Sequence, residues 1–133
     1  MFIGLLAAAA IAANPNLALG RWRTETDNGI VEIVRCGPTI CGRIAGSDRL
    51  RSNPTQTDAH NRNPALRGRK LLGLQILGGF TGSGGAWTGG TIYNADDGGT
   101  YRATLTPLNT DHLKVRGCII WPLCKSQVWT RIR

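Results

Sequence analysis

The sequence predicts an all-β protein, a single antiparallel up-and-down barrel of eight strands. Three observations lead to this prediction. Glycine is frequent, at 18 of 133 residues, and gathers between short apolar runs, which is typical of many turns. Several of these runs are rich in β-branched or aromatic residues. No apolar repeat with the period of a helix persists long enough to form one. The length suits one domain, and eight antiparallel strands can close into a barrel that holds side chains or one small ligand.

The N-terminal residues 1–18 are expected to form a signal peptide. The apolar run Phe2–Ala13 has the length of a signal-peptide core, and a bilayer span needs about 20 residues. Small residues between positions 12 and 18 allow cleavage there. No Lys or Arg precedes the run, and the alternative is a buried N-terminal helix. We expect a protein that is periplasmic or secreted, with a mature domain at residues 19–133 and no transmembrane segment in it.

The first three strands are expected at Arg21–Thr26, Ile30–Cys36 and Ile40–Gly46. Asp27-Asn28-Gly29 separates the first two, because Asn-Gly tolerates the positive φ angles of a tight hairpin turn. Gly37-Pro38-Thr39 provides the second turn.

The segment Ser47–Arg69 is polar and predicts a long exposed loop with one short helical turn. Long loops in compact domains are often functional and otherwise mobile. This loop is also basic, and its positive field indicates either a solvated face or an anion site. The cationic residues are Arg49, Arg51, Arg62, Arg67, Arg69 and Lys70.

Five further strands complete the expected barrel. Alternation is clearest in the fourth of these, which places Leu113, Val115 and Gly117 on one face. The expected strands are Lys70–Phe80, Trp87–Asn94, Thr100–Pro107, His112–Ile119 and Gln127–Ile132.

The four cysteines predict two disulfides. An even number of cysteines in a short exported chain favours disulfides, and zinc sites usually have tighter Cys-x-x-Cys spacing. Successive turns of an up-and-down barrel alternate between its two ends. Cys36 and Cys41 flank the second turn, and Cys118 and Cys124 flank the seventh. These turns lie at opposite ends, so only the local pairs Cys36–Cys41 and Cys118–Cys124 are within reach.

Two tryptophan segments resemble a known signature. Gly20-x-Trp22 opens the first strand, and Trp129-Thr130-Arg131 lies in the last one. This pattern is similar to that of lipocalins and the wider calycin group. The resemblance implies that Arg131 packs across the indole of Trp22 near the closed end of the barrel, a favourable cation–π contact.

A longer series of motifs resembles the bacterial domain-of-unknown-function family 2147, which contains small exported proteins. The resemblance covers nearly the whole mature chain. It implies the fold class and export, and it implies no activity. In chain order the motifs are Gly20-x-Trp22, Cys36-Gly37, Cys41-Gly42-Arg43-Ile44, Trp87-x-Gly89-Gly90-x-Ile92-Tyr93, Gly99-x-Tyr101, Leu113-x-Val115-Arg116-Gly117-Cys118 and Trp129-Thr130-Arg131.

No motif in the sequence specifies a reaction, and we expect no enzyme, metal or cofactor. The serines lie in no Gly-x-Ser-x-Gly elbow, and no Gly-Lys-Ser/Thr follows a glycine-rich stretch. His60 and His112 are expected at the surface. The pair Asp96-Asp97 lies in a glycine-rich turn, where aspartate is common. Nucleic-acid binding is not expected of an exported chain without a stripe of stacking aromatics.

The expected function is binding. In a lipocalin-like barrel the odd-numbered turns crowd the open mouth, so the basic loop and the turn with Trp121 lie there together. That combination suits a small apolar or amphipathic ligand with an anionic head. The candidate ligand-binding residues are Trp87, Tyr93, Tyr101, Trp121, Arg67 and Arg69. Aromatic and aliphatic side chains that simply fill the interior are the competing prediction, and the favoured one for a barrel this small.

The alternative function is a structural or interaction module of the cell envelope. The formal net charge of +8 draws such a protein to anionic surfaces or to an acidic protein partner. High salt would weaken that association, because exposed charges are screened. The sequence sets no oligomeric state and names no ligand.

Overall fold

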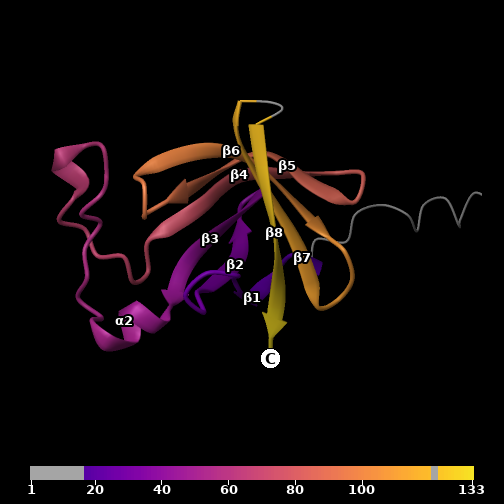
Figure 1. The fold of residues 1–133 in the computed structure, drawn as a ribbon. Helices are drawn as coiled ribbons and strands as arrows, with labels where there is room; N and C mark the ends of the chain where they lie inside the picture. The colour runs from indigo at the N-terminus through magenta and orange to yellow at the C-terminus, as the bar shows by residue number, and fades with distance from the viewer. Residues whose placement is uncertain (1–16, 121–122) are drawn as a thin grey trace, which may run out of the picture.

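The computed structural model describes residues 17–120 and 123–133. The expected signal segment lies almost entirely outside the described residues, and so does Trp121. The described residues form a closed barrel in which each strand pairs with the next and the last with the first (Figure 1). This confirms the predicted fold class. The strands are β1 (Gly20–Arg23), β2 (Ile30–Cys36), β3 (Thr39–Gly46), β4 (Gln75–Ser83), β5 (Ala86–Asn94), β6 (Gly99–Pro107), β7 (His112–Ile120) and β8 (Leu123–Ile132).

The first turn has its centre one residue earlier than expected. Asp27 and Asn28 have φ angles of +56° and +47°, and the amide of Gly29 donates to the carbonyl of Thr26 at 3.0 Å. Asp27 and Asn28 are therefore the central residues of the turn. Gly29 is needed for space, because a Cβ there would lie 2.6 Å from Oγ1 of Thr24. Strand β1 ends at Arg23, before the expected boundary at Thr26.

Two strands, β4 and β8, begin several residues away from their expected first residues. β4 begins at Gln75 and not at Lys70, because Lys70 forms only an isolated bridge to Thr57 within the long loop. Gly73, with a φ of +85°, then interrupts the extended chain. β8 begins at Leu123 and not at Gln127, because the ladder with β7 continues past the cysteines to the end of the hairpin.

The hydrophobic core fills the closed end of the barrel. Leu113 and Val115 of β7 are buried and Lys114 is exposed, so the expected alternation is confirmed. Phe80 packs directly on the backbone of Gly90, where a Cβ would lie 2.5 Å from the ring. The largest fully buried side chains are Trp22, Ile33, Ile40, Leu77, Phe80, Leu105, Leu113 and Asp58, and only the last of these is polar.

Arg131 closes this end, as the family resemblance implies. Its guanidinium carbon lies 4.3 Å from the centroid of the Trp22 ring, and the two residues are paired between β1 and β8. The guanidinium also donates to the carbonyls of Leu17, Leu19 and Thr110 at 2.8, 2.7 and 2.6 Å. The Trp22 indole donates to the carbonyl of Ala18 at 2.9 Å. One side chain thus holds the N-terminal segment and the β6–β7 turn to the barrel.

Both predicted disulfides are present. Cys36 is joined to Cys41, and Cys118 to Cys124, and the described residues contain no free cysteine. Each disulfide closes one hairpin, between β2 and β3 and between β7 and β8. They fix turns at opposite ends of the barrel, as the alternation of turns predicts.

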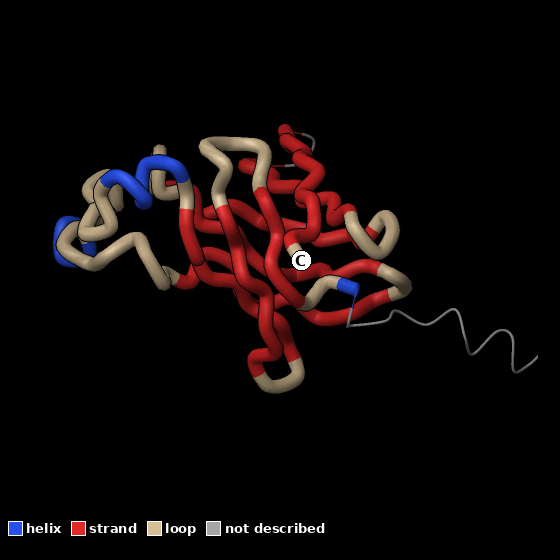
Figure 2. The backbone as a smooth tube through the Cα atoms, turned by 90° about the horizontal axis from the view of Figure 1, so that it is seen from below, coloured by secondary structure: helices blue, strands red, loops and turns tan. Residues whose placement is uncertain are grey.

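The long loop between β3 and β4 lies at one side of the barrel and contains two short helices, where one helical turn was expected (Figure 2). They are α2 (Asp48–Ser52) and the 3₁₀ helix η2 (Pro64–Leu66). Ser47 caps α2, because its hydroxyl accepts the amide hydrogen of Leu50 at 3.1 Å. Asn63 caps η2 in the same way through Ala65.

Candidate ligand-binding cavity

A cavity of about 1310 Å³ opens at the end of the barrel opposite the closed core. Its lining includes residues from the turns after β1 and β5, from the long loop after β3 and, next to the β7–β8 connection, Ile119 of β7 and Leu123 of β8. These are the four connections expected at the mouth. The expectation that side chains fill the interior therefore holds at the closed end and fails toward the mouth. Leu72, in the segment that leads into β4, is 44% exposed.

The wall of the cavity is mainly aliphatic. Gly117 lies in this wall, and a Cβ there would meet only ordinary contacts, the nearest at 3.5 Å from Ile92. The missing side chain at Gly117 leaves room in the interior. Gln127 is a polar wall residue, and its amide oxygen already accepts the Trp129 indole hydrogen at 2.9 Å. The apolar wall residues include Val31, Ile44, Ile76, Ile92 and Val115.

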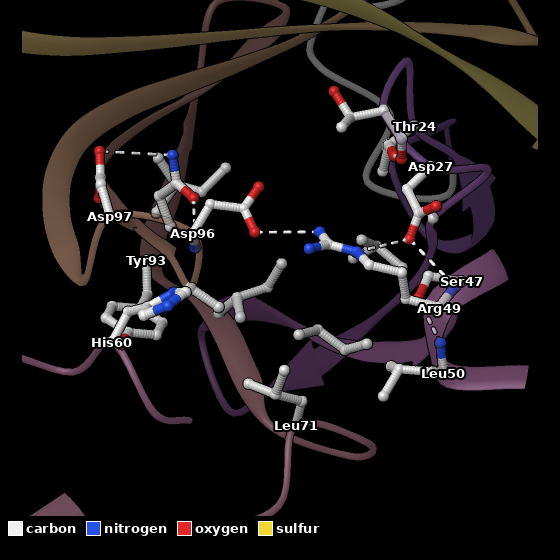
Figure 3. Close-up of a pocket in the computed structure, with 18 of the residues that line it drawn as sticks. Thr24, Asp27, Ser47, Arg49, Leu50, His60, Leu71, Tyr93, Asp96 and Asp97 are labelled. Atoms are coloured by element: carbon white, nitrogen blue, oxygen red, sulfur yellow. Dashed lines mark hydrogen bonds and ion pairs between the residues drawn. The ribbon is translucent and has the colours of Figure 1, made fainter. Parts of the chain in front are cut away.

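Arg49 spans part of the mouth (Figure 3). Its Nε lies 3.1 Å from Oδ2 of Asp27 in the β1–β2 turn, and its Nη2 lies 3.0 Å from Oδ1 of Asp96 in the β5–β6 turn. We call these two ion pairs the Arg49 bridge. The backbone amide and side chain of Arg49 hold the pKa of Asp27 below its usual value, and Asp96 raises the pKa of Arg49. Exposed ion pairs contribute at most about 1 kcal/mol each, so the bridge positions three segments more than it stabilises the fold.

Asp58 anchors the long loop to β5. It is 1% exposed and accepts hydrogen bonds from Tyr93 Oη at 2.6 Å, Asn61 Nδ2 at 2.9 Å and Arg69 Nε at 3.0 Å. Burial alone would raise the pKa of Asp58, and these three donors together hold it below the usual value. Burial and the neighbouring carboxylate raise the pKa of Tyr93. Arg69 also lies over the Tyr93 ring, 5.5 Å from its centroid.

Tyr101 and Asp97 form a second tyrosine–aspartate pair at the mouth. The Tyr101 hydroxyl donates to Oδ2 of Asp97 at 2.5 Å, and the amide of Gly99 donates to its other oxygen at 2.7 Å. The hydrogen bond lowers the pKa of Asp97 and raises the pKa of Tyr101. The nearby Gly98 touches the long loop, since a Cβ there would lie 2.0 Å from the carbonyl oxygen of His60.

The structure brings only some of the predicted ligand-binding residues together. Tyr93 and Tyr101 line the cavity. Trp87 is 6% exposed within the core cluster, outside the cavity lining. Arg69 binds Asp58, and Arg67 donates to the carbonyl of Asn61 at 2.8 Å, so both hold the loop in place. Trp121 lies outside the described residues.

Sequence reasoning missed the aspartates that surround the mouth. Asp27, Asp96 and Asp97 line the cavity together with the cations Arg49 and Lys125. The mouth therefore carries charges of both signs and not the basic field expected there. The placement of the turns was a usable signal, because it already put Asp27 and Asp96 at the same end as the basic loop.

Within the described residues, no group of three or more His, Cys, Asp or Glu side chains is arranged to hold a metal ion. In the same part of the chain, no helix has the length and apolar character needed to cross a bilayer.

Comparisons with known proteins agree with this geometry. The family model "Uncharacterized protein conserved in bacteria (DUF2147)" matches residues 20–131. No curated protein matches the sequence. A solved structure, "Protein HP1028 from the human pathogen Helicobacter pylori belongs to the lipocalin family", matches with a TM-score of 0.76 and 22% identity, over 86% of this chain and 82% of that chain. At this identity the likeness shows the fold, a lipocalin-like barrel.

Proposed function

We propose that this chain, which belongs to the bacterial family DUF2147, is a non-catalytic binding protein that takes a small apolar or amphipathic ligand into its barrel. The cavity carries this proposal. Ligand sites commonly measure about 300–1,000 Å³ and combine an apolar wall with a few polar groups. The cavity here, at about 1310 Å³, has an aliphatic wall and a polar mouth, and it suits a ligand the size of a lipid.

The mouth supports an amphipathic ligand whose polar head stays at the rim. Tyr101 and Tyr93 face the cavity with hydroxyls bound to carboxylates. Each phenol donates its single hydroxyl hydrogen to an aspartate, so it offers a ligand the lone pairs of its oxygen, which can accept a hydrogen bond from a polar head. The basic loop supports an anionic head group less than the sequence suggested, because Arg67 and Arg69 both donate hydrogen bonds to other residues of the loop.

Export to the periplasm or beyond is part of the proposal. The two disulfides support it, because such bonds persist in oxidising compartments and are rare in the cytosol. An envelope location would give the protein access to lipids and other amphiphiles.

Native mass spectrometry of the protein recovered from a periplasmic extract tests the proposal. A bound ligand adds mass that disappears on denaturation, and the denatured mass locates the cleavage site. A bare native mass, together with no uptake of a neutral apolar probe, would count against a carrier. Recovery of the protein only in the cytoplasm would remove the envelope part of the proposal.

A further inference from the structure

The end of the β7–β8 hairpin carries the two most exposed large apolar side chains of the described residues. Ile119 is 75% exposed and Leu123 is 64% exposed. The disulfide between Cys118 and Cys124 joins the two strands directly below them. We call Ile119 and Leu123 the hairpin end. Exposed large apolar side chains on both strands of a cross-linked hairpin indicate a surface that another apolar phase covers.

A basic groove begins where the hairpin end stops. The groove has a volume of about 160 Å³ and lies outside the barrel, between β5, β6 and β7. Arg102 and Arg116 line it, together with the backbone of Gly89 and Gly90. The groove also reaches Cys118, which is the cross-strand partner of Arg102 and immediately precedes Ile119. The groove, on the outer face of the barrel, and the hairpin end, at the rim of the cavity, thus follow one another along β7.

The two guanidinium groups are available for an external anion. Neither Arg102 nor Arg116 forms an ion pair with a carboxylate in the described part of the chain. Arg102 and Thr104 lie on the same face of β6, and Thr104 pairs with Arg116 across the ladder. The groove volume corresponds to about five water molecules, which is enough for one phosphate group. Lys125, exposed on the cavity side of the hairpin, adds a third cation near its end.

We propose that this surface docks the barrel onto an anionic phospholipid bilayer. Ile119 and Leu123 enter the interface, and Arg102 and Arg116 hold a lipid phosphate. Apolar side chains and cations side by side match a bilayer surface, which presents hydrocarbon directly below anionic headgroups. A free phosphate would use the groove and leave the hairpin end without a partner. An acidic protein would be the alternative occupant.

The docking surface adjoins the mouth of the cavity. Ile119 and Leu123 belong both to the hairpin end and to the cavity lining. Docking would therefore bring the mouth to the membrane, where an amphipathic ligand can pass between the bilayer and the barrel. This last step rests on the proposed ligand-binding function, whereas docking itself does not.

Vesicle flotation tests the docking. The full protein is mixed with vesicles of phosphatidylcholine alone, or of phosphatidylcholine with an equal part of phosphatidylglycerol. We expect binding to the mixed vesicles only, and weaker binding at high salt. The double variants Ile119→Ser/Leu123→Ser and Arg102→Gln/Arg116→Gln should each lower vesicle affinity by roughly tenfold or more.

Matched controls distinguish binding through this surface from a general attraction of the cationic protein to anionic vesicles. Leu72→Ser/Leu108→Ser removes exposed apolar side chains elsewhere, and Arg21→Gln/Arg35→Gln removes the same charge from other strands. Both should keep wild-type vesicle affinity. Equal losses in the controls would overturn the proposal, as would binding to an acidic protein but not to vesicles.

Two further experiments complete the test. One distinguishes a lipid phosphate from a free phosphate, and the other separates docking from the proposed ligand binding. Soluble glycerol phosphate is offered to the wild type and to Ile119→Ser/Leu123→Ser. If it binds both proteins as tightly as the wild type binds vesicles, the groove is a site for a free anion, and docking is overturned. A cavity-filling Gly117→Leu variant should still dock, because Gly117 lies in the cavity wall and is not one of the four residues that contact the bilayer. A wild-type protein that docks on vesicles but takes up no apolar probe would thus count against the proposed function alone.

Discussion

Nη2 of Arg49 lies 3.0 Å from Oδ1 of Asp96, although 47 positions separate the two residues in the chain. The same guanidinium binds Asp27, so the long loop, the β1–β2 turn and the β5–β6 turn meet at one side chain. The Arg49 bridge crosses an opening through which a ligand would have to pass. Its effect should therefore appear in the rates of ligand exchange more than in the stability of the barrel.

We expect Arg49→Gln to raise the dissociation rate of a cavity ligand several-fold and to change the free energy of unfolding by less than about 1 kcal/mol. Stopped-flow displacement of a fluorescent apolar probe measures the rate. Arg51→Gln is the matched control, because Arg51 lies on the same short helix, pairs within it with Asp48 and does not line the cavity. Equal rates for both variants would mean that the bridge does not restrict exchange.

Arg131 should be important for stability. Arg131→Ala removes the contact with Trp22 and three hydrogen bonds to backbone carbonyls. We expect a loss of about 2–4 kcal/mol in the free energy of unfolding, measured by urea denaturation. Arg131→Lys should recover only part of it, since an ammonium cannot form the same fork of hydrogen bonds. Arg21→Ala, an exposed residue of the same sheet, should have little effect.

Asp58 predicts a loss of stability in acid. Its folded pKa lies below the unfolded value, so its contribution is fully present above a pH of about 4 and is lost as pH falls through the depressed pKa. Asp58→Asn should cost about 1–3 kcal/mol at neutral pH and flatten the acid limb of the stability curve. Hydrogen exchange should show the loss first in the long loop. Glu32→Gln, which alters only an exposed ion pair at 4.0 Å, should leave the curve unchanged.

Each disulfide should contribute about 2 kcal/mol, because each closes a short loop. The double variants Cys36→Ala/Cys41→Ala and Cys118→Ala/Cys124→Ala should fold and show lower urea midpoints than the wild type. Thiol titration of the denatured wild-type protein should find no free thiol before reduction. Free thiols in protein recovered from the periplasm would contradict the pairing.

Most of the fold could be predicted from the sequence, because turns and the alternation of apolar residues depend on residues close together in the chain. Gly20, Trp22 and Arg131 could be placed because the resemblance assigned them to adjacent strands at one end. Lys70 was misassigned to a strand because its partner, Thr57, lies inside the loop itself. Such pairing within a loop leaves no periodic trace in the sequence.

The site was less predictable, because it depends on which side chains neutralise one another. From the sequence, Arg69 is predicted to be a free cation, whereas in the structure it donates to Asp58. The burial of Asp58 depends on how the whole loop folds. The hollow interior depends in part on the absence of a side chain at Gly117. The alternation placed Gly117 within a strand and on one face with Leu113 and Val115, but the space left beside it depends on the facing strands. The direction of the mouth was predictable, because it follows from the alternation of turns.

Binding of a neutral fluorescent apolar probe to three proteins tests the central claim most directly. These are the wild type, Gly117→Leu, which places a side chain in the cavity, and Gly68→Leu, which places the same side chain in the long loop with no atom within 4 Å of its Cβ. The account predicts saturable binding by the wild type and Gly68→Leu, and at least about tenfold weaker binding by Gly117→Leu, with all three equally folded by circular dichroism. Equal probe affinity in all three, or no saturable binding by the wild type, would contradict a ligand-binding barrel.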